Sequence, residues 1–113
     1  MKDYSALQVR YQRDEPSVQI GGLASNLSRI AWHAGRGSQE SAIPLFRESK
    51  YFTEWAAASC SSVDQQGVLA ELQLQLALWE RGWGERLSPS TIAQEAQQWS
   101  IRLLETSGLF HDG

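Results

Sequence analysis

The sequence of 113 residues is short of cysteine, histidine and long apolar runs, and each shortage excludes a class of protein. Its single cysteine, Cys60, cannot form an internal disulfide. No apolar run approaches the roughly 18 residues that a membrane-spanning helix needs. The N-terminal stretch "MKDYSALQVRYQ" also lacks the apolar core of a signal peptide. We therefore expect a soluble, cytoplasmic protein without a membrane span.

Motifs that hold metals, nucleotides and cofactors are absent as well. The sequence contains no Cys-x-x-Cys, His-x-x-x-His or Glu-x-x-His pair, and no glycine-rich phosphate motif. Its two histidines are His33, near an expected helix end, and His111, near the C-terminus. Cys60 has no histidine close in sequence that would act as its base. We expect no cofactor and no metal, and we expect that the protein is not an enzyme.

The charge pattern gives no sign of a nucleic-acid partner. Formal net charge is -3, and acidic and basic residues mix along the chain without a run of one sign. Proteins that bind phosphate backbones usually present a basic surface instead. The stretch "TIAQEA", Thr91–Ala96, begins like a DNA-binding helix-turn-helix, but the expected glycine turn is missing. Nucleic acid is therefore not an expected partner.

Residues that start and stop helices divide the first half of the chain. Asp3–Arg13 places three apolar side chains on one face and predicts a short N-terminal helix. Pro16 suits the first turn of the next helix, which we expect to continue to about Ala34. The loop "HAGRGSQES" follows, where Gly35 or Gly37 can adopt the left-handed conformation that ends a helix.

Two further helices are predicted to have a proline in their first turn. Pro44 is expected in the first turn of the third main helix, with Ser41 as its cap. Ser88 is expected to cap the last helix, with Pro89 in its first position. Gly108 suits the left-handed residue that ends that helix.

The segment "ELQLQLALWERGW", Glu71–Trp83, fits both a strand and a helix on first inspection. Its leucines alternate, as in a half-buried strand, but no β-branched residue, which strands favour, occurs between Leu69 and Trp83. A longer apolar series has helical spacings of three and four: Leu69, Leu72, Leu76, Trp79 and Trp83. Upstream, Ser62 and Gln65 form a capping box. The pattern therefore predicts a helix over Val63–Trp83.

This helix has a second apolar face, which a surface helix normally lacks. Leu74 and Leu78 lie one turn apart and nearly opposite the main stripe, beside Ala70 and Ala77. Either the helix runs through the middle of the protein, or this face contacts another chain. A self-complementary patch on a long helix readily gives two-fold pairing, so a homodimer is the preferred form of contact.

Five tryptophans are many for so short a chain. Large aromatic side chains contribute strongly to cores, and their indole N–H groups also suit interfaces. The tryptophans therefore indicate core residues, with contact to a partner or a ligand as the alternative.

Three stretches, "GGLASNLSRIAW", "ESKYFTEWAA" and "LQLQLALW", together resemble small uncharacterised helical proteins of cyanobacteria. The resemblance covers about Val18 to Leu109 and contains no catalytic motif. It implies the cytoplasm of a phototroph and identifies no functional residue.

The sequence as a whole predicts a single all-α domain over residues 1–113. Its expected architecture is an antiparallel bundle of four main helices with a short N-terminal helix. The expected function is that of a non-enzymatic interaction module, an adaptor, regulator or assembly factor, with an unidentified protein partner. The candidate interface residues are Leu74, Leu78, Ala70 and Ala77. Two alternatives stay open: a bundle that binds an apolar ligand or pigment, and a small enzyme of unrecognised type.

Overall fold

The computed structural model describes residues 4–108 of the chain, and this part is all-α, as predicted. No strand occurs within these residues, where a single isolated bridge joins Trp83 and Leu87. Five helices form in chain order: α1 (Ser5–Gln12), α2 (Pro16–Gly35), α3 (Gln39–Ser59), α4 (Val63–Gly82) and α5 (Pro89–Ser107). The predictions for Asp3 and His111 lie outside the described residues.

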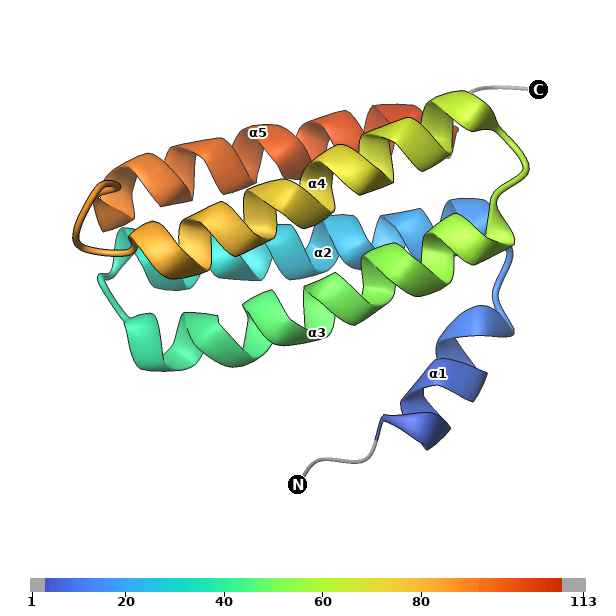
Figure 1. Ribbon diagram of the computed structural model, residues 1–113, viewed down its shortest axis with the longest axis horizontal. Helices are drawn as coiled ribbons and strands as arrows, with labels where there is room; N and C mark the ends of the chain where they lie inside the picture. The colour runs from blue at the N-terminus through green and yellow to red at the C-terminus, as the bar shows by residue number, and fades with distance from the viewer. Residues whose placement is uncertain (1–3, 109–113) are drawn as a thin grey trace.

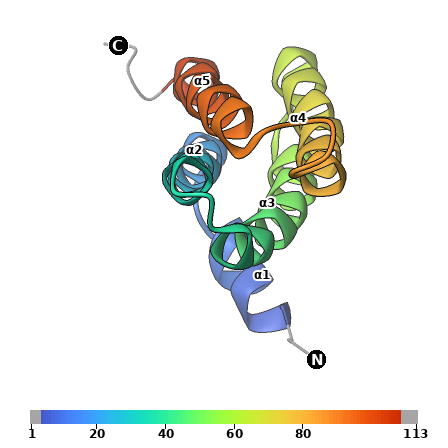
Figure 2. The same cartoon turned by 90° about the vertical axis from the view of Figure 1, so that its left-hand side faces the viewer.

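The four long helices lie side by side and form a helical bundle, while α1 projects from one end (Figure 1). Packing is closest between α2 and α5, and α3 joins α2 to α4. By contrast, α4 and α5 contact each other only slightly, and the end view shows α4 at the margin of the bundle (Figure 2). One side of α4 therefore lies on the outside of the described fold.

Most predicted helix boundaries are confirmed by the capping contacts. Pro16 is the first residue of α2. The Ser62 hydroxyl accepts a hydrogen bond from the backbone N–H of Gln65 at 3.3 Å, which caps α4. The side chain of Gln65 does not complete the predicted capping box, because it donates to the backbone oxygen of Thr106 in α5 at 3.0 Å. This contact ties the first turn of α4 to the end of α5.

The predicted ends of α5 and the predicted left-handed glycine after α2 are also confirmed. The Ser88 hydroxyl accepts from the backbone N–H of Thr91 at 3.1 Å and caps α5. Gly108 takes the predicted left-handed conformation, with φ of 78°. Gly37 is the left-handed residue after α2, with φ of 70°, whereas Gly35 is still helical.

The predicted start of α3 is wrong. The helix begins at Gln39 rather than near Ser41, so the preceding loop is shorter than predicted and Pro44 lies inside the helix. The additional turn buries Ala42 completely, together with Phe46 one turn later. Proline prefers the first turn because it has no N–H to donate and because, deeper in a helix, its ring clashes with the carbonyl four residues earlier. Here burial of Ala42 outweighs the hydrogen bond that Pro44 cannot donate to the carbonyl of Glu40.

A single connected core joins the long helices. One apolar face of α2 is buried, and so are the predicted inner positions of α4 and the apolar face of α5. These fully covered side chains are Ile20, Leu23, Leu27 and Ile30 in α2, Leu69, Leu72, Leu76 and Trp79 in α4, and Ile92, Ala96 and Leu103 in α5. Helical spacing therefore identified the core face of α4 correctly.

The short helix α1 is attached to the bundle by aromatic contacts. The ring of Tyr11 stacks on Phe52 of α3 with centroids 4.1 Å apart, and it also contacts Trp55. The Tyr11 hydroxyl donates a hydrogen bond to the backbone oxygen of Gln19 in α2. Burial of the phenol, with smaller contributions from Cys60 and Asp14, raises the pKa of Tyr11 well above its usual value. The folded protein therefore favours the neutral phenol.

This burial predicts that the protein loses stability at alkaline pH. Because the folded pKa of Tyr11 is the higher one, its contribution is complete below the unfolded pKa of about 10 and falls as pH rises above it. The slope for one such group is at most about 1.4 kcal/mol per pH unit. The loss of stability is measured from denaturation midpoints at pH 8 and pH 11.

We expect the fall in stability between these two pH values to be smaller in Tyr11→Phe than in wild type. In Tyr51→Phe, a control on the exposed surface of α3, we expect the same fall as in wild type. Equal drops in all three proteins would contradict the assignment to Tyr11.

Candidate interaction surface

The two faces of α4 have opposite surroundings. On the inner face Leu69, Leu72, Leu76 and Trp79 are buried against the other helices. The indole N–H of Trp79 donates to the Glu95 carboxylate of α5 at 2.8 Å. Since a buried indole N–H usually needs an acceptor, this contact fixes the rotation of α4 about its axis. The opposite face must therefore point away from the core.

The predicted second face of α4 is on the surface. Leu74 is 63% exposed and Leu78 is 48% exposed, whereas Ala70 is exposed and Ala77 is half-buried. We call these four residues the α4 outer face. Within residues 4–108, about half or more of the surface of each leucine stays open to solvent. The alternative in which α4 runs through the middle of the protein is therefore excluded for the described part of the chain.

Two further residues extend this surface toward the start of α4, and sequence analysis had missed them. Val63 is 80% exposed, and the space around Gly67 is open. At 100° per residue both lie on the same side of the helix as Leu74. Continuing the spacing of three and four from Leu74 back through Ala70 would have found them. The exposed apolar strip thus runs along most of α4.

One ion pair borders the strip on its α5 side, and a second lies farther round α4 on its α3 side. On the α5 side, Arg102 and Glu71 form an ion pair with an N–O distance of 2.8 Å, and the Arg102 guanidinium also lies over the ring of Trp99. The hydrogen bond from Arg102 lowers the pKa of the Glu71 carboxyl. On the α3 side, Lys50 binds Glu80 at 3.1 Å. An apolar strip with a polar rim is the usual composition of a protein interface.

The tryptophans divide between core and surface. Trp55 and Trp79 are buried, and Trp83 and Trp99 pack partly buried against the core. Trp32 of α2 differs, with 57% of its side chain exposed and the guanidinium of Arg36 over its ring at 4.0 Å. The prediction of core tryptophans is therefore confirmed for four of the five.

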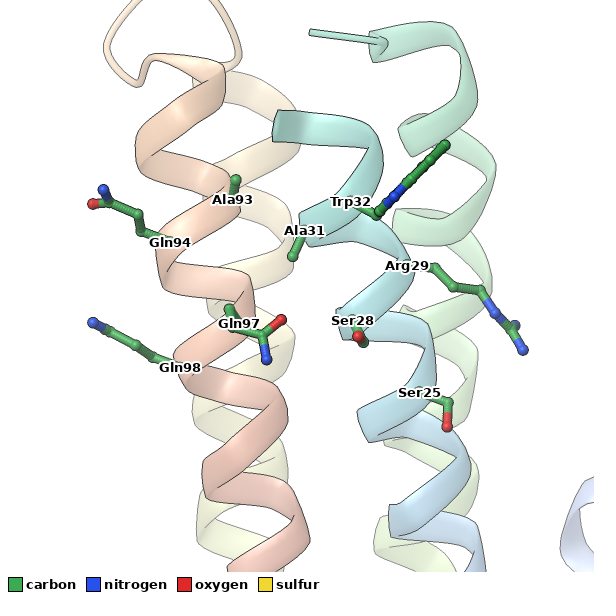
Figure 3. Close-up of a pocket in the computed structure, with 9 residues that line it drawn as sticks. All are labelled: Ser25, Ser28, Arg29, Ala31, Trp32, Ala93, Gln94, Gln97 and Gln98. Atoms are coloured by element: carbon green, nitrogen blue, oxygen red, sulfur yellow. The ribbon is translucent and has the colours of Figure 1, made fainter. Parts of the chain in front are cut away.

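Trp32 lies at the edge of a shallow hollow between α2 and α5 (Figure 3). Its ring points away from α5, and the side chains of Gln94 and Gln98 point away from α2 (Figure 3). Small residues, Ser28, Ala31 and Ala93, line the hollow between the two helices. Gln97 points toward α2, whereas Trp32, Gln94 and Gln98 diverge (Figure 3), so the hollow does not present a converging set of polar groups to a ligand.

In the part of the chain that the structure describes, cysteine, histidine and acidic side chains do not form a cluster that could hold a metal ion. Cys60 is buried, and the ring of His33 contacts Trp32 edge-on with centroids 5.1 Å apart. Among residues 4–108, no group of three or more histidine, cysteine or acidic side chains is placed to hold a metal ion. Within the same residues, no helix has the length and apolar content to cross a membrane.

Comparisons with protein-family models, with curated proteins and with solved structures gave no match to this chain.

Proposed function

We propose that the protein is a non-enzymatic interaction module that binds a protein partner through the α4 outer face. The observation that supports this most is the exposure of Leu74 and Leu78, one turn apart on a helix whose other face is already buried. Single exposed leucines are common on protein surfaces, whereas a continuous apolar strip more often marks a contact site. Covering both leucines would contribute on the order of 2 kcal/mol, since each is about half exposed.

The surroundings of the strip suit a contact surface. The inner face of α4 and the Trp79–Glu95 hydrogen bond hold the helix in one orientation, so a partner meets a preorganised surface. Gly67, Ala70 and Ala77 are small, which lets another helix approach closely along the strip. The ion pairs on either side leave a polar rim that favours one orientation of the partner.

The proposal also includes the arrangement of the helices, the cellular location and the kind of organism. Consecutive long helices are antiparallel, so α4 is one member of a rigid four-helix bundle. The module works in the cytoplasm, as an adaptor, regulator or assembly factor. The resemblance to small helical proteins of cyanobacteria stays a prediction, and a phototroph is the proposed cellular setting.

The proposal is tested by comparing partner recovery from an extract of the native cells. Wild-type protein, the Leu74→Gln/Leu78→Gln double variant and Ile101→Gln are immobilised in equal amounts. Ile101 is a matched control, because it is 49% exposed but lies on α5 outside the strip. We expect the same proteins to be recovered with wild type and Ile101→Gln, and to be lost with the double variant. Equal recovery with all three would contradict an interaction through the α4 outer face.

A further inference from the structure

We infer that the partner of the α4 outer face is a second copy of this chain, with the two α4 helices packed antiparallel and Leu74 on the two-fold axis. This inference rests on the proposed function and specifies its partner. It follows from three properties of the outer face: its symmetry, its charges and its size.

The outer face is self-complementary under a two-fold rotation about an axis through Leu74, which makes the second α4 helix antiparallel to the first. The rotation brings Leu74 against Leu74 of the second copy, and it places Ala70 at nearly the same level as Ala77 of that copy. Leu78 then packs into the space beside Leu74 of the other helix. On the α3 side of the contact, alanine meets alanine, so the helices can approach to the lower end of the usual 8–10 Å range.

The charged residues of α4 beside the outer face favour the antiparallel orientation. Glu71 and Asp64 carry negative charge toward the start of α4, and Arg81 carries positive charge toward its end. With 1.5 Å of rise per residue, the rotation places Arg81 about midway between the levels of Asp64 and Glu71 of the second copy. A parallel pair would instead place each of these charges against its own copy, where like charges repel each other.

Arg81 and Glu71 are available for ion pairs between the two copies. Arg81 is exposed and makes no ion pair with any residue in the described range 4–108. Glu71 binds Arg102 through its Oε2 atom, which leaves Oε1 as an acceptor for Arg81 of the second copy. The Glu71–Arg102 pair thus also keeps the carboxylate at the rim of the strip.

The size of the face predicts a weak and reversible dimer. In this register most of α4 overlaps, over a length of about 25 Å. A strip one helix face wide buries on the order of a few hundred Å² per copy, below the about 800 Å² of a standard interface. We therefore expect the mass in solution to rise with concentration from 12.7 kDa toward twice that value.

Cysteine cross-linking tests the register in the full-length protein. The variants carry Cys60→Ala, so that one introduced cysteine is the only thiol. Leu74→Cys lies on the two-fold axis, where two Cα atoms can come within the 4.4–6.8 Å that a disulfide needs. Leu78→Cys is the matched control, because the two copies of residue 78 lie about 12 Å apart along the axis in an antiparallel pair. We expect Leu74→Cys to form disulfide-linked dimers at least tenfold faster than Leu78→Cys, and than the control Ile101→Cys.

Each other outcome overturns the inference. Equal cross-linking of Leu74→Cys and Leu78→Cys would indicate a parallel pair or random collision. A constant monomer mass for the wild type at millimolar concentration, without cross-linking, would exclude a second copy as the partner. In that case the proposed function is judged separately, by whether recovery of a different protein from the extract depends on Leu74 and Leu78.

Discussion

Replacing Trp79 with alanine is expected to lower the free energy of unfolding by about 3–5 kcal/mol. Trp79 is fully buried on the inner face of α4, in contact with Phe46 of α3 and hydrogen-bonded to Glu95 of α5. The loss has two parts: the transfer of a large aromatic side chain and the cavity that it leaves. Because Trp79 contacts both neighbouring helices, α4 would also lose the side chain that fixes its rotation.

The measurement is the denaturation midpoint of Trp79→Ala, with Trp32→Ala as a control of the same chemistry. Trp32 is exposed, and its main contact is the stacked guanidinium of Arg36, which is worth about 0.5–1 kcal/mol at an exposed site. The two tryptophan variants should therefore differ in stability by at least about 2 kcal/mol. Similar losses in both variants would show that the inner face of α4 is wrongly assigned.

Replacing Ala96 with leucine is expected to destabilise the protein by about 1–3 kcal/mol. Ala96 is fully buried on α5, the helix that packs most closely on α2. The Ser100 hydroxyl donates to the backbone oxygen of Ala24 at 2.8 Å, so the two helices are held at a short distance by a hydrogen bond. Three additional carbon atoms at this contact must either force α5 outward or strain their rotamers.

Thermal or chemical denaturation of Ala96→Leu checks this prediction against Gln97→Leu. Gln97 is the next residue of α5 and is exposed, so the same leucine there has free space. We expect Gln97→Leu to change the free energy of unfolding by less than about 0.5 kcal/mol. If Ala96→Leu were as stable as wild type, the α2–α5 contact would have more room than its buried alanines indicate.

Local signals in the sequence predicted most of the fold. Ser62, Ser88, Pro16 and Gly108 act on their own helix ends, so their effect depends on few residues and was predicted correctly. The start of α3 was missed because it depends on a distant contact: burial of Ala42 against the rest of the core outweighs the preference of Pro44 for a first turn. A local sequence pattern does not show whether burial of Ala42 or the preference of Pro44 decides where the helix begins.

At the candidate interaction surface, too, local features were predicted and contacts between distant residues were not. Helical spacing placed Leu74 and Leu78 opposite the core stripe, and the structure keeps them there. Periodicity alone did not show whether another helix covers them, because that depends on how α4 packs on α3 and α5. The Arg102–Glu71 pair at the rim joins two helices that are far apart in sequence, so it too required the structure.

The free energy of unfolding of the Leu74→Gln/Leu78→Gln variant tests most directly whether the α4 outer face is available for contact rather than needed for folding. Glutamine and leucine have similar helix propensities, and both side chains already face solvent. Measured by chemical denaturation in dilute solution, the variant should therefore lie within about 0.5 kcal/mol of wild type. A loss of several kcal/mol would contradict the account, because it would mean that the glutamines are buried without hydrogen-bond partners and that the face belongs to the core.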